Sequence, residues 1–270
     1  MIIDTHSHLS FKAYDKDRDE VIKRVQKEGV VCIDVGTDYN SSRKVVELAE
    51  NHENIYASVG VHPEAINEGF DKEKYKKLAL SASRRVVAIG EIGLDYYYKP
   101  KTKTRLEQFK DLQKQVFIEQ LKLAEELNLP VIIHCRMAHA DVMEILKNYS
   151  LPTTNYKLTG VVHCFTGNWE EAQKYMDLGF YLGINGIIFK LDLDEVIKKC
   201  PLDKILVETD CPYLTPLPAV ASAKAGPKEY IRNEPIFVKH IIQKIAEIKG
   251  VSFQEVADTT TKNAKSLFKI

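Results

Sequence analysis

The chain has 270 residues, of which 38 are basic and 38 acidic, so its formal net charge is zero. A neutral protein lacks the continuous basic surface of a protein that coats duplex DNA, so any contact with nucleic acid must be a local patch. Hydrophobic residues make up 44% of the chain, which excludes a disordered protein and suits one large α/β domain or two small ones.

The cysteines indicate a reducing compartment. There are five, scattered at positions 32, 135, 164, 200 and 211, with no CxxC pair, so they do not form a disulfide framework. The sequence shows neither a charged-then-apolar leader nor a run of about 18 apolar residues. We therefore expect a cytoplasmic protein that does not enter a membrane, and nothing in the sequence indicates an obligate protein partner.

Short apolar runs alternate with amphipathic stretches along the chain. The runs predict eight strands, at residues 2–3, 30–35, 55–59, 86–89, 131–133, 160–162, 180–184 and 205–207. The amphipathic stretches predict helices at 17–27, 41–51, 104–127, 140–148 and 168–178, the third opening with a Thr104-x-x-Glu107 capping box. Further helices are expected at 234–250, behind a Ser252-x-x-Glu255 box, and at 260–268.

This alternation predicts an α/β protein with parallel strands. The runs are nearly continuous and rich in β-branched residues, as in strands that are covered on both faces. Eight strand–helix units match a (β/α)8 TIM barrel, and no linker or low-complexity tract divides the chain, so residues 1–270 are read as a single domain. A doubly wound open sheet is the alternative, because the seventh predicted strand is rich in glycine.

Candidate metal ligands recur where the predicted strands end. His6 and His8 are two residues apart, so on an extended chain their side chains point to the same side. Later strands are followed by four more candidates: Glu91, His134, His163 and Asp210. Any one of these has an ordinary structural explanation, such as a helix cap or a buried histidine. Together they form four imidazoles and two carboxylates at the carboxyl ends of barrel strands, too many for one tetrahedral ion and suited to two.

Sequence blocks that span nearly the whole chain resemble one known family. The blocks are IDTHSHL at 3–9, GVHP at 60–63, GEIGLDY at 90–96, LPVIIHCR at 129–136, HCFTG at 163–167, ETDCPY at 208–213 and RNEP at 232–235. In this order they resemble the TatD-type metal-dependent deoxyribonucleases of the amidohydrolase superfamily. Two departures are Ser10, where the family commonly has Asp or Asn, and the unusually long connection at 217–231.

The resemblance implies a barrel that holds two divalent ions, with magnesium, manganese or zinc as candidates. It assigns His6, His8 and Asp210 to one ion, His134 and His163 to the other, and Glu91 as a bridge between them. The activity that it implies is hydrolysis of DNA phosphodiesters, often from a 3′ end.

Three residues are candidates for the chemistry itself. Asp210 is expected to orient the attacking water and accept its proton. Glu91 is expected to be essential because it would join the two ions. His62, which follows the third strand, would contact the phosphate or help the leaving group, although a histidine before proline can also simply finish a turn.

Substrate-binding candidates lie beyond the strand ends. Arg136 could grip a phosphate oxygen or form an ordinary salt bridge, and Arg232 and Asn233 have a similar choice. The segment 95–105 interleaves tyrosines with cations, and its Tyr96 is the aromatic candidate for base stacking. The alternative for this segment is a solvated loop before a long helix.

Together these features predict a divalent-metal-dependent deoxyribonuclease that acts on the 3′ ends of single-stranded or frayed DNA, with RNA left open as a substrate. One alternative is an amidohydrolase-type enzyme that cleaves an ester or amide, such as an aminoacyl-tRNA linkage. Another is a barrel that only binds a partner. That scaffold is disfavoured because it would be expected to lose some of the six ligands.

Overall fold

The computed structural model describes residues 1–149, 157–216 and 231–270. Within this part of the chain, eight parallel strands follow one another around a single sheet in the order of the sequence. They are β1 (Ile2–Ser7), β2 (Val30–Val35), β3 (Ile55–Val59), β4 (Val86–Asp95), β5 (Val131–Arg136), β6 (Gly160–Val162), β7 (Tyr181–Ile184) and β8 (Ile205–Val207). A bridge from Ser7 of β1 to Cys211, just beyond β8, brings the two ends of the sheet together. The result is the predicted TIM barrel, and the doubly wound alternative is wrong.

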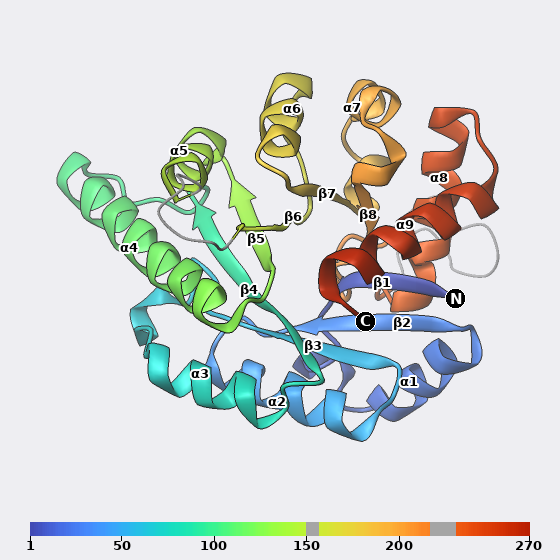
Figure 1. Ribbon diagram of the computed structural model, residues 1–270, viewed down its shortest axis with the longest axis horizontal. Coiled ribbons are helices and arrows are strands. Elements are labelled where there is room, and N and C mark those ends of the chain that lie inside the picture. The colour runs from blue at the N-terminus through green and yellow to red at the C-terminus, as the bar shows by residue number, and fades with distance from the viewer. Residues whose placement is uncertain (150–156, 217–230) are drawn as a thin grey trace.

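Helices surround this barrel (Figure 1). They are α1 (Arg18–Lys27), α2 (Tyr39–Asn51), α3 (Lys72–Ser81), α4 (Lys103–Leu127), α5 (His139–Tyr149), α6 (Trp169–Asp177), α7 (Asp194–Lys199), α8 (Val238–Lys249) and α9 (Phe253–Phe268). No helix in the described ranges combines the length and the apolar character needed to span a bilayer.

The strands agree with the predicted runs, and three of them continue further into polar sequence. β1, β4 and β5 extend to Ser7, Asp95 and Arg136, because parallel pairing continues there, with Ser7 opposite Asp34 and Asp95 opposite Arg136. His6, Glu91 and His134 therefore lie within strands and not in the loops that follow. A strand holds such side chains in more fixed directions than a loop does.

The observed helices correct the sequence-based predictions in three respects. α3 and α7 were not predicted, and the Thr104-x-x-Glu107 capping box was wrong, since α4 begins at Lys103 behind Thr102. The helix expected from residue 234 begins at Val238, after a short 3₁₀ turn. Ser252 does cap the last helix, accepting a hydrogen bond from the backbone N–H of Glu255 at 3.1 Å, and α9 runs on as one helix through residue 268.

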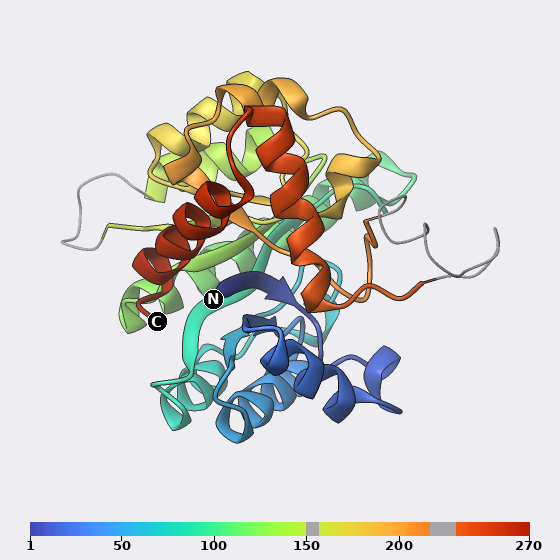
Figure 2. The ribbon, with the colours of Figure 1, turned by 90° about the vertical axis from the view of Figure 1, so that its right-hand side faces the viewer.

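Apolar packing inside the barrel determines which of its two ends is left for polar side chains. Side chains of β1, β2, β4, β5, β6 and β8, including Ile33 and Leu206, form one buried cluster together with Ala264 and Leu267 of α9. α9 lies beside β1 and the N-terminus (Figure 2), and Thr261 donates a hydrogen bond to the carbonyl of Met1. The amino end of the barrel is therefore filled with apolar side chains, and the carboxyl end is left for polar ones. Of the long connection at 217–231, only Ile231 lies inside the described residues.

Candidate metal centre

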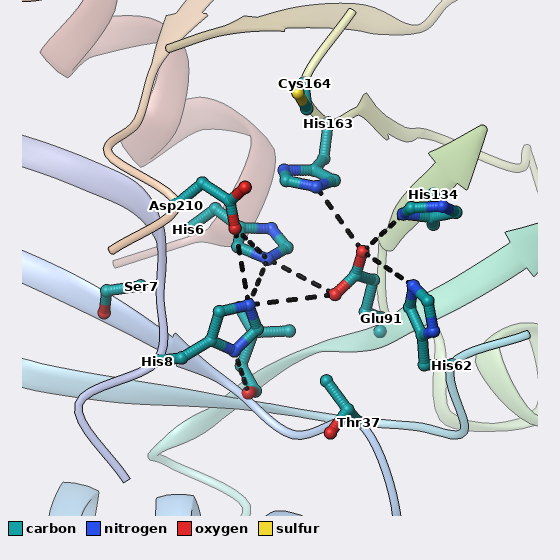
Figure 3. A network of polar contacts seen from close by, with 12 residues as sticks. His6, Ser7, His8, Thr37, His62, Glu91, His134, His163, Cys164 and Asp210 are labelled. Carbon is teal, nitrogen blue, oxygen red and sulfur yellow. Dashed lines mark hydrogen bonds and ion pairs between the residues drawn. The ribbon is translucent and has the colours of Figure 1, made fainter. Parts of the chain in front are cut away.

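The six predicted metal ligands and His62 converge at the carboxyl end of the barrel (Figure 3). They come from six different strands or the residues that directly follow them. An open pocket of about 430 Å³ reaches all of them except the fully buried His6. Glu91 occupies the middle of the group, and its two carboxylate oxygens face different sets of imidazoles.

The first set lies around Oε2 of Glu91. His6 and His8 bring their Nε2 atoms to 3.5 Å and 3.9 Å from this oxygen, and these two nitrogens are 3.1 Å apart. Oδ1 of Asp210 completes the set, 3.5 Å from Nε2 of His8 and 3.9 Å from Nε2 of His6. Two nitrogens and two carboxylate oxygens thus surround one small volume.

The second set lies around Oε1 of Glu91. Nδ1 of His134 is 2.8 Å from this oxygen, Nε2 of His163 is 3.4 Å away and Nε2 of His62 is 3.5 Å away. One carboxylate therefore separates two groups of potential ligands, which is the geometry expected of a bridging residue.

In three of the imidazoles, the ring nitrogen that points away from Glu91 forms a hydrogen bond with an oxygen acceptor. The contacts are His8 Nδ1 to the carbonyl oxygen of Val35, His163 Nδ1 to Glu208 Oε1, and His134 Nε2 to Asp95 Oδ2, each 2.9 Å long. Because each acceptor requires an N–H, each ring must present its lone pair to the centre when it is neutral. Asp95 and Glu208 thus set the tautomers of His134 and His163, a role that the sequence did not predict.

His62 has the opposite arrangement. Its Nδ1 accepts a hydrogen bond of 3.1 Å from the backbone N–H of Glu64. Burial lowers the pKa of His62 to about 3, so the ring is neutral near pH 7 and its proton sits on Nε2. His62 therefore presents an N–H to the pocket, where it can donate a hydrogen bond, whereas His8, His134 and His163 present lone pairs once they are neutral.

The charges of the centre are strongly coupled. Burial acts to raise the pKa of Glu91, but the surrounding imidazoles outweigh it and hold this pKa well below its usual range. Burial acts to lower the pKa values of His134 and His163. Hydrogen bonds with Asp95 and Glu91 nevertheless raise the pKa of His134 to about 9, and the charges of Glu208 and Glu91 raise that of His163 to about 10. Without metal, both rings are protonated at neutral pH, so an arriving cation must displace their protons.

Hydrogen bonds to the buried carboxyl group of Asp4 connect β1 to the residues that follow β8. This group accepts hydrogen bonds from the backbone N–H of Thr209 at 2.8 Å, the Thr209 hydroxyl at 2.6 Å and the backbone N–H of His6 at 3.3 Å. Beside it, the backbone N–H of Asp210 donates to the carbonyl of His6 at 2.9 Å. These bonds set the spacing of two members of the first set, His6 and Asp210.

Comparison with known proteins places this site in a family. A family model described as TatD related DNase matches residues 3–269. The chain belongs to the TatD family. The uncharacterized metal-dependent hydrolase YabD of Bacillus subtilis is 41% identical over 274 residues and 100% of both chains. The 3′-5′ ssDNA/RNA exonuclease TatD of Cronobacter sakazakii is 36% identical, over 99% of this chain and 97% of that protein.

A solved structure supports the same placement. The TatD homologue YjjV from Escherichia coli K12 superimposes with a TM-score of 0.84 and 29% identity, covering 100% of this chain and 98% of that one. The TatD-family chain is therefore a metal-dependent hydrolase that acts on ester bonds and belongs to the amidohydrolase superfamily.

Of the predicted substrate-binding residues, the structure brings only His62 and Arg136 to the pocket of this TatD-family protein. The hydroxyl of buried Tyr96 donates to Asp141 at 2.7 Å. Arg232 pairs with Asp17 at 2.6 Å.

Asn233 is the third of the predicted residues that lie elsewhere. It is buried and donates to the carbonyl oxygens of Thr209 and Tyr213 at 2.9 Å and 2.6 Å. The side chains of all three residues are thus engaged in contacts that support the loops around the site.

Proposed function

We propose that this TatD-family chain is an exonuclease that removes nucleotides from the 3′ ends of single-stranded or frayed DNA by metal-dependent hydrolysis. The observation that carries the proposal is the position of Glu91 between two groups of ligands at the floor of an open pocket. A phosphodiester needs such an environment, because its phosphorus is already surrounded by negative charge and resists attack by water. The printed name of the Cronobacter relative supports a single-stranded substrate.

The donor set fits two divalent ions. We assign His6, His8 and Asp210 to one ion and His134 and His163 to the other, with Glu91 shared. The support lies in the lone pairs that His8, His134 and His163 direct inward when they are neutral, because of the acceptors behind them. Four imidazole nitrogens favour zinc over magnesium, since imidazole suits zinc whereas magnesium prefers oxygen ligands. When bound, two such ions lower the pKa of water and neutralise charge on the phosphate.

The protein's own side chains then complete the reaction. Burial acts to raise the pKa of Asp210, but its hydrogen bond with His8 and the charge of His163 keep that pKa below its usual value. Asp210 is thus ionised at neutral pH and can orient a water molecule and accept its proton. We assign His62 to the substrate and not to the metal ligands, because its Nε2–H can donate to a phosphate oxygen. Arg136 lines the same pocket with 44% of its side chain exposed and can contact a second phosphate oxygen.

A panel of substrates tests this proposal. Single-stranded DNA labelled at either end, blunt duplex DNA, single-stranded RNA, an aminoacyl-tRNA and a small carboxylic ester would each be incubated with manganese or zinc and, separately, with excess EDTA. We expect stepwise release of mononucleotides from 3′ ends of single strands, abolished by EDTA and by Asp210→Asn. Preferential cleavage of the ester or the aminoacyl-tRNA would replace this function by that of a carboxylic ester hydrolase, and faster digestion of blunt duplex would contradict the single-strand preference.

A further inference from the structure

We propose that Tyr97 and Tyr98, packed against Arg136, form a platform on which bases of the single-stranded substrate stack outside the metal pocket. This inference rests on the proposed exonuclease function and extends it from the reacting phosphate to the neighbouring nucleotides. Three independent observations carry it: the exposure of these aromatic rings, their attachment to the metal centre, and a groove that leads away from them.

Exposed aromatic side chains gather at this rim. Tyr97 is 49% exposed and Tyr98 70% exposed, and Met137, directly after Arg136, is 65% exposed. Large apolar side chains left in solvent beside a polar pocket commonly mark a binding surface. The same stretch contains Tyr96, which is only 5% exposed and faces inward. The chain thus turns one tyrosine into the fold and leaves the next two outside it.

The two rings are fixed relative to the metal centre through Arg136. The guanidinium carbon of Arg136 lies 3.6 Å from the ring centroid of Tyr97 and 5.7 Å from that of Tyr98, and the two rings meet edge to face with centroids 4.7 Å apart. Arg136 Nη1 is also 4.0 Å from Oδ2 of Asp95, the atom that holds His134. The backbone N–H of Tyr97 donates to the other oxygen of Asp95 at 2.8 Å. One carboxylate therefore links the platform to a metal ligand.

A second open pocket, of about 560 Å³, continues from this point. Asp95 and Glu64 line both pockets, so the two are contiguous. The second pocket is lined by Tyr98 and by one face of α4, made of Arg105, Gln108, Phe109 and Leu112. These positions follow the i, i+3, i+4, i+7 pattern and span roughly 10 Å along the helix, about the length of three stacked bases.

The chemistry of this surface selects a single-stranded nucleic acid as its occupant. Aromatic faces accept any unpaired base, and the guanidinium group of Arg105 complements the phosphates between bases. Bases inside a duplex are already stacked on one another and cannot lie on these rings. The surface is continuous with a pocket that takes the reacting phosphate, so the same strand can occupy both. The platform accordingly favours single strands without reading sequence.

The test compares the double variant Tyr97→Ala/Tyr98→Ala with the matched variant Tyr97→Phe/Tyr98→Phe, which keeps the rings. Both are assayed on an oligothymidylate of about twelve nucleotides, a dinucleotide and bis(p-nitrophenyl) phosphate. For the alanine variant we expect KM for the oligonucleotide to rise about tenfold with kcat within about twofold, and no change on the two small substrates. The phenylalanine variant should behave as the wild type.

Abasic substitution in the oligonucleotide adds a direct readout of stacking. Removing a base that lies on the platform should raise KM for the wild type and have no further effect on the alanine variant. Equal KM values for the wild type and the alanine variant on every oligonucleotide would overturn the platform and leave the exonuclease function standing. Equal losses on bis(p-nitrophenyl) phosphate would also overturn it, since the tyrosines would then act through Asp95 on the metal centre. A wild type that cleaves only the small diester would overturn the proposed function itself.

Discussion

Replacing Asp95 by Asn tests whether the groups behind the histidines control metal binding. Asp95 Oδ2 lies 2.9 Å from His134 Nε2, while its Oδ1 accepts the backbone N–H of Tyr97 at 2.8 Å. In Asp95→Asn the amide oxygen can keep the bond to Tyr97, so the NH₂ group faces His134. Two N–H donors cannot bond to each other, so the ring must shift its proton to Nδ1 and lose the lone pair that faces Glu91.

The structure predicts how far metal affinity falls and which of the two metal-binding events weakens. Loss of an outer partner of a metal-bound imidazole weakens metal affinity about 10- to 100-fold, or about 1.4–2.8 kcal/mol. His134 belongs only to the ligand set around Oε1 of Glu91, so only one of two binding events should weaken. Isothermal titration of metal-free protein with manganese or zinc resolves the two events. Because the hydrogen bond with Asp95 raises the pKa of His134, that pKa, measured by NMR on the metal-free variant, should also fall.

Asp141→Asn is the matched control for this experiment. It removes the same charge from a carboxylate that contacts Tyr96 and Lys114 but no member of the metal centre. We expect unchanged affinities for both ions in this variant. Wild-type affinities in Asp95→Asn would show that Asp95 does not set the tautomer of His134. Equal weakening of both binding events would show that Asp95 acts through the fold and not through His134.

Three further predictions concern the reaction, pH and stability. Asp210→Asn should lower the initial rate of hydrolysis at least 10³-fold, about 4 kcal/mol, with an unchanged circular dichroism spectrum. In the metal-free protein, the pKa values of His134 and His163 are raised from an ordinary 6.5 to about 9 and 10. Protonation of these rings therefore stabilises the fold fully below about pH 6.5, and this stabilisation is lost as the pH rises through 9–10. The rise in Tm on adding metal should accordingly be larger at about pH 8.5 than at about pH 6, and a larger rise at the lower pH would contradict the protonated rings. Asp4→Ala should lower the free energy of unfolding in urea by about 2–4 kcal/mol, because it leaves the donors of Thr209 unpaired, and a loss below about 0.5 kcal/mol would show that this link does not stabilise the barrel.

The sequence predicted the barrel well because its strands are almost purely apolar. Runs such as 30–35 and 205–207 can only be buried on both faces, and their bounds match the structure. The ends of β4 and β5 were not predictable in this way, since polar residues such as Asp95, His134 and Arg136 continue the strands through pairing with a neighbour. α3 and α7 were missed because one has a weak apolar stripe and the other has only six residues.

No local pattern in the sequence identifies Asp95 and Glu208 as the hydrogen-bond acceptors of His134 and His163. Glu208 lies 45 residues from His163 and Asp95 lies 39 residues from His134, so only the register of the barrel brings each pair together. Both acids stand inside the blocks ETDCPY and GEIGLDY, which was the one signal that could have drawn attention to them. Which of the neighbouring tyrosines is exposed could not be predicted from the sequence for a related reason. Only the fold decides that Tyr96 faces inward while Tyr97 faces solvent.

We propose that one carboxylate, Glu91, joins two metal ions in the active enzyme, and this role can be measured. It is tested most directly by adding manganese or zinc in measured equivalents to metal-free protein and recording the rate of nucleotide release from end-labelled single-stranded DNA. We expect activity to rise to its maximum at two equivalents per chain and Glu91→Gln to stay inactive at every ratio. Full activity at one equivalent, or an active Glu91→Gln enzyme, would contradict it.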